Sequence, residues 1–555
     1  MDAASLLRGN HKKGNIILST VSGVGTTKDE LIRLFDRSIP SVDIITTKSF
    51  QVTPNPGNRE PIVCSPSPGN FGNSVGLRNP GMDVILPEIK ALREDGLRAI
   101  LNISLSASNP EDFITLVKAF DPYADMLELN FSCPHAAAGF GASIGNDAEI
   151  ASSYVEAICK AYPERKALLI IKLTPNVPDI GTIAKAVIDK GADGIAAINT
   201  VGPKLYIEPH SEKPILNNKL GGKGGASGEW VREEALSCIS AIRKAIGDEP
   251  IILGMGGVTR PEDARAMIEA GADSVGIGSA LSRVNPQKWE DYFNAMKRGG
   301  DVSSLLTDDL PLQYTPHTVI SKEMHKDVMI LTITGSMDCK AGEFVFLWIP
   351  GKGEKPFSVA VNDPLTFLIK KRGAFTEALF ELEPGDEVYT RGLSGKPMVY
   401  RKSAKALLIG GGTGSAVLPL IGDMLKKDGT EMDIRVGVVE RENGKEPLED
   451  VLSTYGKVMF VADDGKPGRV LDTITAEDVA GDTACYIVGP GKMMQKAAEI
   501  LSSLGVADDS IYLSMEKNTM CGIGMCGECV CGGHLPCKEG TFFTWKTLKE
   551  NKAEL

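Results

Sequence analysis

The chain has 555 residues, of which 42% are hydrophobic and 24% are charged, and its formal net charge is −12. This length predicts about three or four globular domains. An acidic chain without a basic tract is not expected to bind nucleic acid, and no apolar run is long enough to span a membrane. The N-terminal residues lack the apolar stretch of a signal peptide, and five of the eleven cysteines crowd near the C-terminus, so we expect a cytoplasmic protein with reduced thiols.

Eight short apolar runs alternate with helical stretches over the first half of the chain. Their continuous apolar character is typical of parallel strands that are buried on both faces. Eight strand–helix repeats predict a (β/α)8 barrel of the α/β class over residues 1–305, with its active site where the strands end. The runs cover residues 15–19, 42–46, 98–103, 126–130, 168–173, 193–199, 250–254 and 273–277.

Polar residues and glycines stand at the ends of these predicted strands. One polar strand end is usually a cap or a turn, but eight aligned ends predict a site. The glycines late in the series could offer backbone N–H groups to a phosphate, a lysine could stabilise negative charge on a reduced flavin ring, and asparagine amides could recognise a planar imide. The residues are Ser22 and Gly23, Lys48 and Ser49, Asn102, Asn130 with Cys133, Lys172, Asn199 with Thr200, Gly256 with Gly257, and Gly278 with Ser279.

Seven segments resemble the class 1 dihydroorotate dehydrogenases over roughly residues 14–295: TTKSF (46–50), NSVGLRNPG (73–81), NFSCPH (130–135), IKLTPN (171–176), NT (199–200), GGASG (224–228) and GMGG (254–257). The resemblance implies a barrel that oxidises dihydroorotate in pyrimidine synthesis and pairs into a homodimer. It implies that FMN is bound by Ser22, Gly23, Lys48, Ser49, Asn102, Asn130, Lys172, Ile198, Gly228, Gly256, Gly257, Gly278 and Ser279. It implies that the substrate is bound by Lys48, Asn73, Ser74, Val75, Gly76, Leu77, Asn130, Asn199 and Thr200.

Cys133 matches the catalytic base of that family, which takes a proton from C5 of dihydroorotate while hydride leaves C6 for the flavin. A thiol in a Gly- and Ala-rich segment could close over the substrate and exclude water. Nearby donors or positive charge would favour its thiolate. The alternative is a buried structural cysteine.

His135 departs from the family pattern, which usually has asparagine after SCP. Dihydropyrimidine dehydrogenases share the barrel and have histidine there, so a uracil- or thymine-type substrate is the alternative to dihydroorotate. The segments NSVGLRNPG and TTKSF favour dihydroorotate because they match the orotate-binding pattern.

A boundary falls near residues 298–311, where Gly, Asp, Ser and Pro separate two patterned regions. A β-rich stretch over residues 306–400 then predicts a small antiparallel barrel. Residues 406–421 read as a strand, a glycine-rich turn and a helix, which is typical of a nucleotide site at Gly410, Gly411, Gly412 and Gly414 within a domain over 401–503. A tight turn between strand and helix without a ligand is the alternative.

Cys521, Cys526, Cys529 and Cys537 follow the spacing C-x4-C-x2-C-x7-C in a glycine-rich segment of the last domain, 504–555. Three crowded thiols with a fourth nearby suit a [2Fe–2S] cluster. A zinc site more often has two separated C-x2-C pairs, and buried structural thiols are the other alternative. We expect Cys531 to be spare.

The order of these regions resembles the electron-transfer subunit of class 1B dihydroorotate dehydrogenase, a ferredoxin reductase-like flavoprotein, over roughly residues 312–545. The carrying segments are KPFS (355–358), where lysine replaces the usual arginine, and RGAFT (372–376). The segment VGPGKMM (488–494) replaces a Cys-Gly-Pro motif. The resemblance implies FAD bound by Lys355, Pro356, Phe357, Ser358, Ile369, Lys370 and Thr376.

Taken together, the sequence predicts a fused class 1B-like dihydroorotate dehydrogenase. We expect electrons to pass from FMN through the [2Fe–2S] cluster to FAD and then to NAD⁺. The alternatives are a dihydropyrimidine dehydrogenase and a diaphorase-type electron-delivery module for a protein acceptor. A complete set of barrel site residues argues against the diaphorase.

Overall fold

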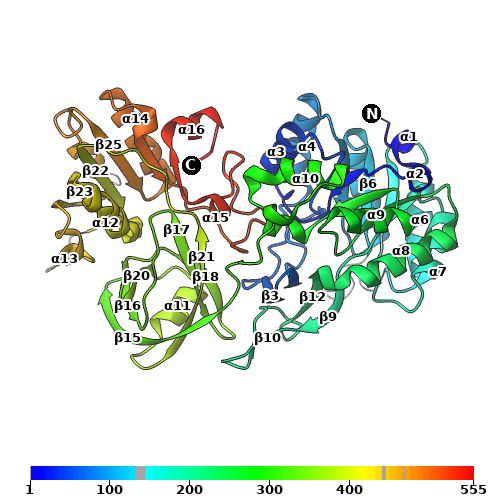
Figure 1. Cartoon of the computed structure of the whole chain (residues 1–555), viewed down its shortest axis with the longest axis horizontal. Coiled ribbons are helices and arrows are strands. Elements are labelled where there is room, and N and C mark those ends of the chain that lie inside the picture. The colour runs from blue at the N-terminus through cyan, green and yellow to red at the C-terminus, as the bar shows by residue number, and fades with distance from the viewer. Residues whose placement is uncertain (1, 132–143, 441–444, 464, 467–468) are drawn as a thin grey trace. The chain divides into compact units, whose positions relative to one another are not determined.

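The computed structural model describes residues 2–131, 144–440, 445–463, 465–466 and 469–555. The chain forms two compact units (Figure 1). The first contains the residues up to Leu310 together with Ile523–Glu528, and the second contains Pro311–Gly522 and Cys529–Leu555. In the described part of the chain, no helix has the length and apolar character to cross a membrane.

The first unit is built on a closed barrel of eight parallel strands in the order β1-β14-β13-β8-β7-β6-β5-β2. The predicted (β/α)8 barrel is therefore confirmed, and each strand overlaps one of the eight apolar runs. Their side chains are almost all buried, as expected for strands covered on both faces. The strands are β1 (Leu18–Thr20), β2 (Ile44–Thr46), β5 (Ile100–Leu105), β6 (Met126–Asn130), β7 (Leu168–Lys172), β8 (Gly194–Ala197), β13 (Ile251–Met255) and β14 (Ser274–Ile277).

Helices connect successive barrel strands and lie around them (Figure 1). Several begin at a capping side chain: Asn109 accepts a hydrogen bond from Asp112 N, and Asp147 and Asp179 do the same at the next two helices. Such caps satisfy N–H groups that have no partner inside the helix. The helices are α3 (Asp29–Ser38), α4 (Met82–Glu94), α5 (Pro110–Phe120), α6 (Ala148–Ala161), α7 (Ile180–Asp189), α8 (Arg232–Ile246), α9 (Pro261–Glu269) and α10 (Trp289–Arg298).

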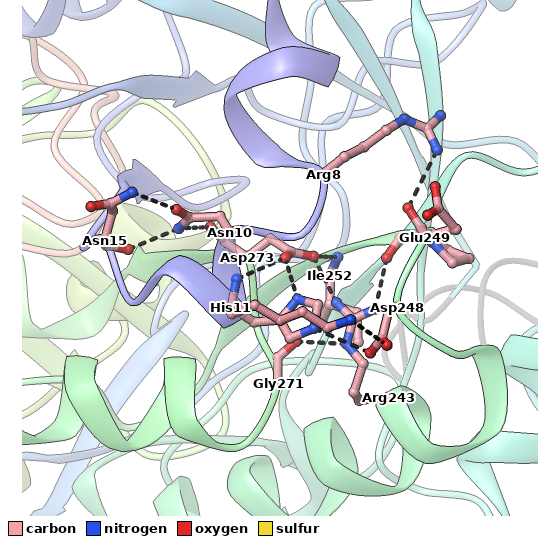
Figure 2. Close-up of polar contacts among 12 residues, drawn as sticks. Arg8, Asn10, His11, Asn15, Arg243, Asp248, Glu249, Ile252, Gly271 and Asp273 are labelled. Atoms are coloured by element: carbon pink, nitrogen blue, oxygen red, sulfur yellow. Dashed lines mark hydrogen bonds and ion pairs between the residues drawn. The ribbon is translucent and has the colours of Figure 1, made fainter.

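The N-terminal helices α1 (Ala3–Leu7) and α2 (Asn10–Lys13) close the amino end of the barrel. Ala3 and Leu7 pack with a cluster of barrel residues that includes Ile17, Ile44, Ile100, Met126, Ile170 and Ile251. Asp273 is fully buried and accepts hydrogen bonds from His11 Nδ1 at 2.7 Å and Arg243 Nη2 at 2.7 Å (Figure 2). Because this end is filled, a ligand site in the barrel must lie at the carboxyl ends of the strands.

A second sheet of the first unit was not predicted from the sequence. It has the antiparallel order β3-β4-β12-β9 and holds two of the segments that carry the family resemblance. Its strands end at Asn73 and Gly228, two predicted site residues. The strands are β3 (Val63–Ser67), β4 (Asn70–Asn73), β9 (Val201–Leu205) and β12 (Lys223–Gly228). Between β9 and β12 in the chain, β10 (Ile207–Glu208) and β11 (Lys213–Pro214) form a separate two-stranded sheet.

The second unit begins with a seven-stranded antiparallel sheet in the order β18-β17-β21-β15-β16-β20-β19. The antiparallel pairing of the predicted small barrel is confirmed. Its elements are β15 (Thr315–His325), β16 (Val328–Ile333), β17 (Glu343–Ile349), β18 (Gly353–Phe357), β19 (Val361–Asn362), β20 (Leu365–Lys370), α11 (Ala374–Phe380) and β21 (Glu387–Gly395).

A six-stranded sheet follows in the order β24-β23-β22-β25-β26-β27. All pairs are parallel except β26 with β27. Strands are added on one side of β22 up to β24, and the order then switches to its other side with β25. Ligands of open parallel sheets bind at such a switch point. The elements are β22 (Lys405–Gly411), α12 (Leu418–Asp428), β23 (Glu431–Val438), α13 (Glu449–Leu452), β24 (Lys457–Ala462), β25 (Thr483–Val488), α14 (Gly491–Ser503), β26 (Ile511–Ser514), α15 (Pro536–Glu539), β27 (Phe542–Thr544) and α16 (Trp545–Glu550).

Candidate functional site

Hydrogen-bonded hydroxyl groups connect the carboxyl ends of neighbouring barrel strands. Ser49 Oγ lies 3.0 Å from Ser22 Oγ and 2.9 Å from Ser104 Oγ. Asn130 Nδ2 donates to Ser49 Oγ at 3.1 Å. The structure thus brings three of the predicted FMN residues together, and Ser104, which was not predicted from the sequence, joins them.

Lys48 is nine-tenths buried beside the loop that follows β1. Gly23 in that loop has a φ of +84°, and a Cβ there would lie 3.0 Å from Lys48 Nζ. A side chain at position 23 would therefore be strained and would crowd the lysine. The structure therefore places Gly23 and Lys48, two of the predicted FMN residues, next to each other.

Lys172, at the end of β7, is only 5% exposed and lies near a buried carboxylate. Its Nζ donates to Met255 Sδ at 2.9 Å and is 3.9 Å from Glu128 Oε1. Glu128 is fully buried in β6. It was not predicted as a site residue from the sequence because it lies inside a run that is otherwise apolar. The available signal was a charged residue two positions before Asn130, on the same side of the strand.

The predicted phosphate-binding glycines follow two neighbouring barrel strands. Gly256 and Gly257 come directly after β13, and Gly278 and Ser279 directly after β14, which pairs with β13. Gly257 has a φ of +74°, and a Cβ there would lie 2.7 Å from Arg232 Cβ. The tight backbone leaves N–H groups rather than side chains at this end, which suits a phosphate.

The predicted substrate segment 73–77 leaves the second sheet at the end of β4. Asn73 Nδ2 donates to Gly225 O at 3.4 Å, and Ser74 Oγ accepts hydrogen bonds from Asn58 and Asn218. Ser74 is therefore engaged in holding the segment itself. Val75, Gly76 and Leu77 follow, with Gly76 at a φ of +78° and Leu77 at +58°.

The remaining predicted barrel residues divide between described and undescribed parts of the chain. Asn199 and Thr200 lie between β8 and β9, and Thr200 N donates to Asn199 Oδ1 at 2.7 Å. Asn102 is fully buried in β5 and its Nδ2 donates to Thr46 Oγ1 at 3.2 Å, and Ile198 is 4% exposed. Cys133 and His135 lie outside the described residues.

A sequence model described as dihydroorotate dehydrogenase matches residues 9–297. The chain belongs to the dihydroorotate dehydrogenase family. The prediction of an enzyme of this family, an oxidoreductase, is confirmed. The family match leaves the second unit outside it, so the function of that unit depends on its own geometry.

Relatives named as the catalytic subunit of dihydroorotate dehydrogenase B (NAD(+)) occur in several organisms. That of Methanothermobacter thermautotrophicus is 38% identical over 44% of this chain and 76% of the relative. That of Methanocaldococcus jannaschii is 40% identical over 43% and 74%. Among solved structures, the dihydroorotate dehydrogenase of Eimeria tenella with ferulenol is 18% identical over 51% of this chain and 79% of that chain, with a TM-score of 0.42.

A cavity of about 860 Å³ lies in the second unit at the switch point of the six-stranded sheet. The cavity is lined by Gly411, Gly412 and Gly414 of the predicted nucleotide turn, by Lys370, which was predicted to bind FAD, and by Glu440. Their binding of a nucleotide stays a prediction. A Cβ at Gly414 would lie 2.8 Å from Val488 O, so this close approach requires glycine. The cavity has the size and the glycine-rich wall of a nucleotide site.

The other predicted FAD residues lie on the antiparallel sheet and α11. Lys355, Pro356 and Phe357 are in β18 with Ser358 directly after it, and Ile369 is in β20. Gly410, which was predicted with the glycines of the nucleotide turn, is in β22 of the six-stranded sheet. Thr376 Oγ1 accepts hydrogen bonds from Arg372 N at 2.8 Å and Gly373 N at 3.1 Å. The Thr376 hydroxyl therefore orders the turn that begins α11, and its role toward FAD stays a prediction.

Three of the four predicted cluster cysteines lie together in the second unit. Cys529 Sγ is 3.4 Å from Cys537 Sγ, and the neighbouring Cys521 and Cys529 side chains together with burial raise the pKa of Cys537. Cys526 lies in the segment Ile523–Glu528, which belongs to the first unit. Its carbonyl accepts a hydrogen bond from Thr27 Oγ1 at 2.6 Å. Among the described residues, no group of three or more His, Cys, Asp or Glu is arranged to hold a single metal ion. The spacing and the buried thiols fit a cluster by their donor chemistry.

Cys531 makes different contacts from the other thiols of this segment. Its Sγ lies 3.8 Å from Glu554 O, and it packs in the apolar cluster around Leu513, Met515 and Trp545. This placement supports the expectation that Cys531 is not a cluster ligand.

Proposed function

We propose that this chain oxidises dihydroorotate to orotate with NAD⁺ as the final electron acceptor, and that it carries the catalytic and electron-transfer halves on one polypeptide. One observation carries the proposal: a barrel of the dihydroorotate dehydrogenase family shares its chain with a glycine-lined nucleotide-sized cavity and a buried cysteine cluster. Covalent fusion keeps donor and acceptor at a high effective concentration. Pairing of two chains through the barrel stays a prediction.

In the barrel, FMN would supply the acceptor for the hydride that leaves C6 of dihydroorotate. Ser22, Ser49 and Lys172 would hold the ring. Gly256, Gly257, Gly278 and Ser279 would hold the phosphate. Asn102 Oδ1 is buried and has no hydrogen-bond partner among the described residues, which supports a ligand N–H group at that place.

The substrate would be held by both charge and hydrogen bonds. Lys48 and the backbone N–H groups of the 73–77 segment would meet the carboxylate, and Asn130 and Asn199 would recognise the imide with their amides. Cys133 would take the proton from C5, a role that depends on the family resemblance. Positive charge near this thiol would favour the thiolate that the step requires.

In the second unit, Lys370, Gly411, Gly412 and Gly414 would bind nucleotide phosphates, and the residues of β18 would hold FAD beside them. Cys521, Cys526, Cys529 and Cys537 would ligate the [2Fe–2S] cluster, which would supply one-electron transfer between the two flavins. The glycine-lined cavity supports the dinucleotide part of this assignment.

His135 favours one alternative substrate, uracil or thymine, on the sequence pattern alone. The two substrates differ in the carboxylate that orotate carries. Buried donors left unpaired cost about 1–3 kcal/mol each, so a site built for the carboxylate should reject dihydrouracil. A diaphorase serving a protein acceptor would need neither Lys48 nor the 73–77 segment.

The test is anaerobic reduction of the purified full chain by dihydroorotate or dihydrouracil, followed at flavin and cluster wavelengths. We expect dihydroorotate to exceed dihydrouracil by at least roughly a hundredfold in kcat/KM, and we expect His135→Asn to keep this preference. Equal or better turnover of dihydrouracil would assign the chain to pyrimidine reduction. No reduction by either compound, with NADH still reducing the chain, would favour the diaphorase.

A further inference from the structure

The structure contains a fully buried carboxylate, Glu128, that the proposed chemistry does not use. It lies in the middle of β6, which pairs on one side with β5, the strand of Ser104, and on the other with β7, the strand that ends at Lys172. Ser104 is its direct cross-strand neighbour and donates from Oγ to Glu128 Oε1 at 3.1 Å. A buried carboxylate is costly unless positive charge or donors compensate it, so its position needs a reason.

Compensation of Glu128 is incomplete among the described residues. Glu128 Oε1 is 3.9 Å from Lys172 Nζ, which is beyond a hydrogen bond, and Glu128 Oε2 has no hydrogen-bond partner. Lys172 Nζ instead donates to Met255 Sδ at 2.9 Å, and a thioether is only a weak acceptor. The ammonium group is therefore held near the carboxylate while its donors stay available for a stronger acceptor.

We propose that Glu128 is a positioning residue that holds Lys172 at the flavin and, through its negative charge, lowers the reduction potential of the FMN bound in the barrel. This inference rests on the FMN site of the proposed function. Lys172 alone would favour the reduced, negatively charged ring and raise its potential. A buried negative charge beside the lysine offsets part of that effect, because electrostatic interactions are strong where water is excluded.

The offset has a use in the proposed reaction. Electrons must leave the barrel flavin for NAD⁺, and a flavin whose reduced form is stabilised too strongly would retain them. The link from Glu128 through Ser104 to Ser49 also joins the carboxylate to the hydroxyl and amide groups at the proposed ring site. Glu128 therefore acts on the flavin through its neighbours and is not placed to contact it.

The experiment is a redox titration of the full chain carrying nitrogen-labelled FMN, whose NMR signals separate it from unlabelled FAD. In Glu128→Gln, the ratio of reduced to oxidised FMN at a fixed potential is expected to rise at least tenfold, or about 30 mV for a two-electron couple. Asp121→Asn is the matched control. Asp121 is also a buried carboxylate of the barrel, but it accepts hydrogen bonds from Tyr162 Oη and from Ala167 N just before β7. The ratio of reduced to oxidised FMN in Asp121→Asn should therefore change less than threefold.

If Glu128→Gln does not fold, a second pair of variants tests the inference. Glu128→Gln in a Lys172→Met background removes the carboxylate without leaving a lone buried ammonium, and its ratio should exceed that of Lys172→Met by at least threefold. Changes below threefold in both comparisons, or a fall, would overturn the inference. So would a double variant that fails to fold where Lys172→Met folds, because Glu128 would then serve the fold independently of Lys172. A wild-type chain that binds no FMN would overturn the FMN assignment as well.

Discussion

Cys133 comes three residues after the last residue of β6, in the segment NFSCPH. As the proposed base at C5, it should be required for flavin reduction but not for flavin binding. Cys133→Ala is expected to bind FMN and to be reduced by dihydroorotate about 10²–10⁴-fold more slowly, the usual cost of losing a general base. Stopped-flow absorbance of the flavin measures this rate.

Cys238→Ala is the control for a merely structural thiol, because Cys238 packs on the buried face of α8. It should change the rate little. Cys133→Ser should react best at higher pH, since a hydroxyl loses its proton less readily than a thiol. Near-normal reduction of Cys133→Ala would remove the assignment.

Cys531 and Cys526 should respond differently to substitution. Cys531 packs against apolar residues near Glu554, so Cys531→Ala should keep the electron paramagnetic resonance signal of the reduced cluster. Cys526→Ala should lose that signal, because each iron needs its full set of four ligands. The reverse result would reassign the ligands.

The sequence placed the polar strand ends of the barrel but missed Glu128 and Ser104. Both lie inside strands whose apolar neighbours identified them as buried, and residue type alone does not show which buried polar groups face the barrel interior. Their relation to Lys172 comes from strand pairing, which a linear pattern does not contain. The contacts of Cys133 and His135 stay predictions.

At the scale of secondary-structure elements, Asp273 joins α2, α8 and β13 at the closed end of the barrel (Figure 2). Asp273→Asn would leave Arg243 without its buried charge partner. The expected loss is about 3–5 kcal/mol of unfolding free energy, as for other broken buried pairs. Denaturant unfolding, followed by tryptophan fluorescence and circular dichroism, measures this free energy.

Asp248→Asn serves as the control for that change. Asp248 pairs with His11 and Lys12 at the surface, where its side chain is 55% exposed, and such pairs contribute little to stability. If both variants lost the same stability, the buried position of Asp273 would not be the cause.

The eight barrel strands could be predicted because each is a continuous apolar run followed by a helix. The β3-β4-β12-β9 sheet could not, since its strands VCSPS, NFGN and KGGASG are rich in Gly, Ser and Pro and carry no alternation. In these segments the turn-forming residues dominated the pattern. Pairing with partners far along the chain decided the structure.

At the scale of the whole molecule, the two half-reactions should be separable by a single change. A side chain at position 414 would collide with Val488 O at the glycine-lined cavity of the second unit. Gly414→Leu is therefore expected to abolish NAD⁺ reduction while the barrel flavin is still reduced by dihydroorotate. Single-turnover absorbance with and without NAD⁺ distinguishes the two steps.

Gly429→Ala provides the control, because Gly429 follows α12 and a Cβ there meets nothing within 4 Å. It can lower stability through its φ of +75°, but NAD⁺ reduction should remain. Retained NAD⁺ reduction in Gly414→Leu would show that the barrel passes hydride on without this cavity.

Helices α1 and α2 close the amino end of the barrel, so we expect dihydroorotate and orotate to enter and leave at the carboxyl ends of the strands. Dihydroorotate and orotate would then bind at the same site, so that binding of one excludes the other. We expect orotate to inhibit competitively against dihydroorotate. Against NAD⁺, for which we propose a separate site in the second unit, we expect orotate to inhibit noncompetitively, as in two-site ping-pong kinetics. Closure of the amino end of the barrel therefore leads to mutually exclusive binding of substrate and product at the carboxyl end.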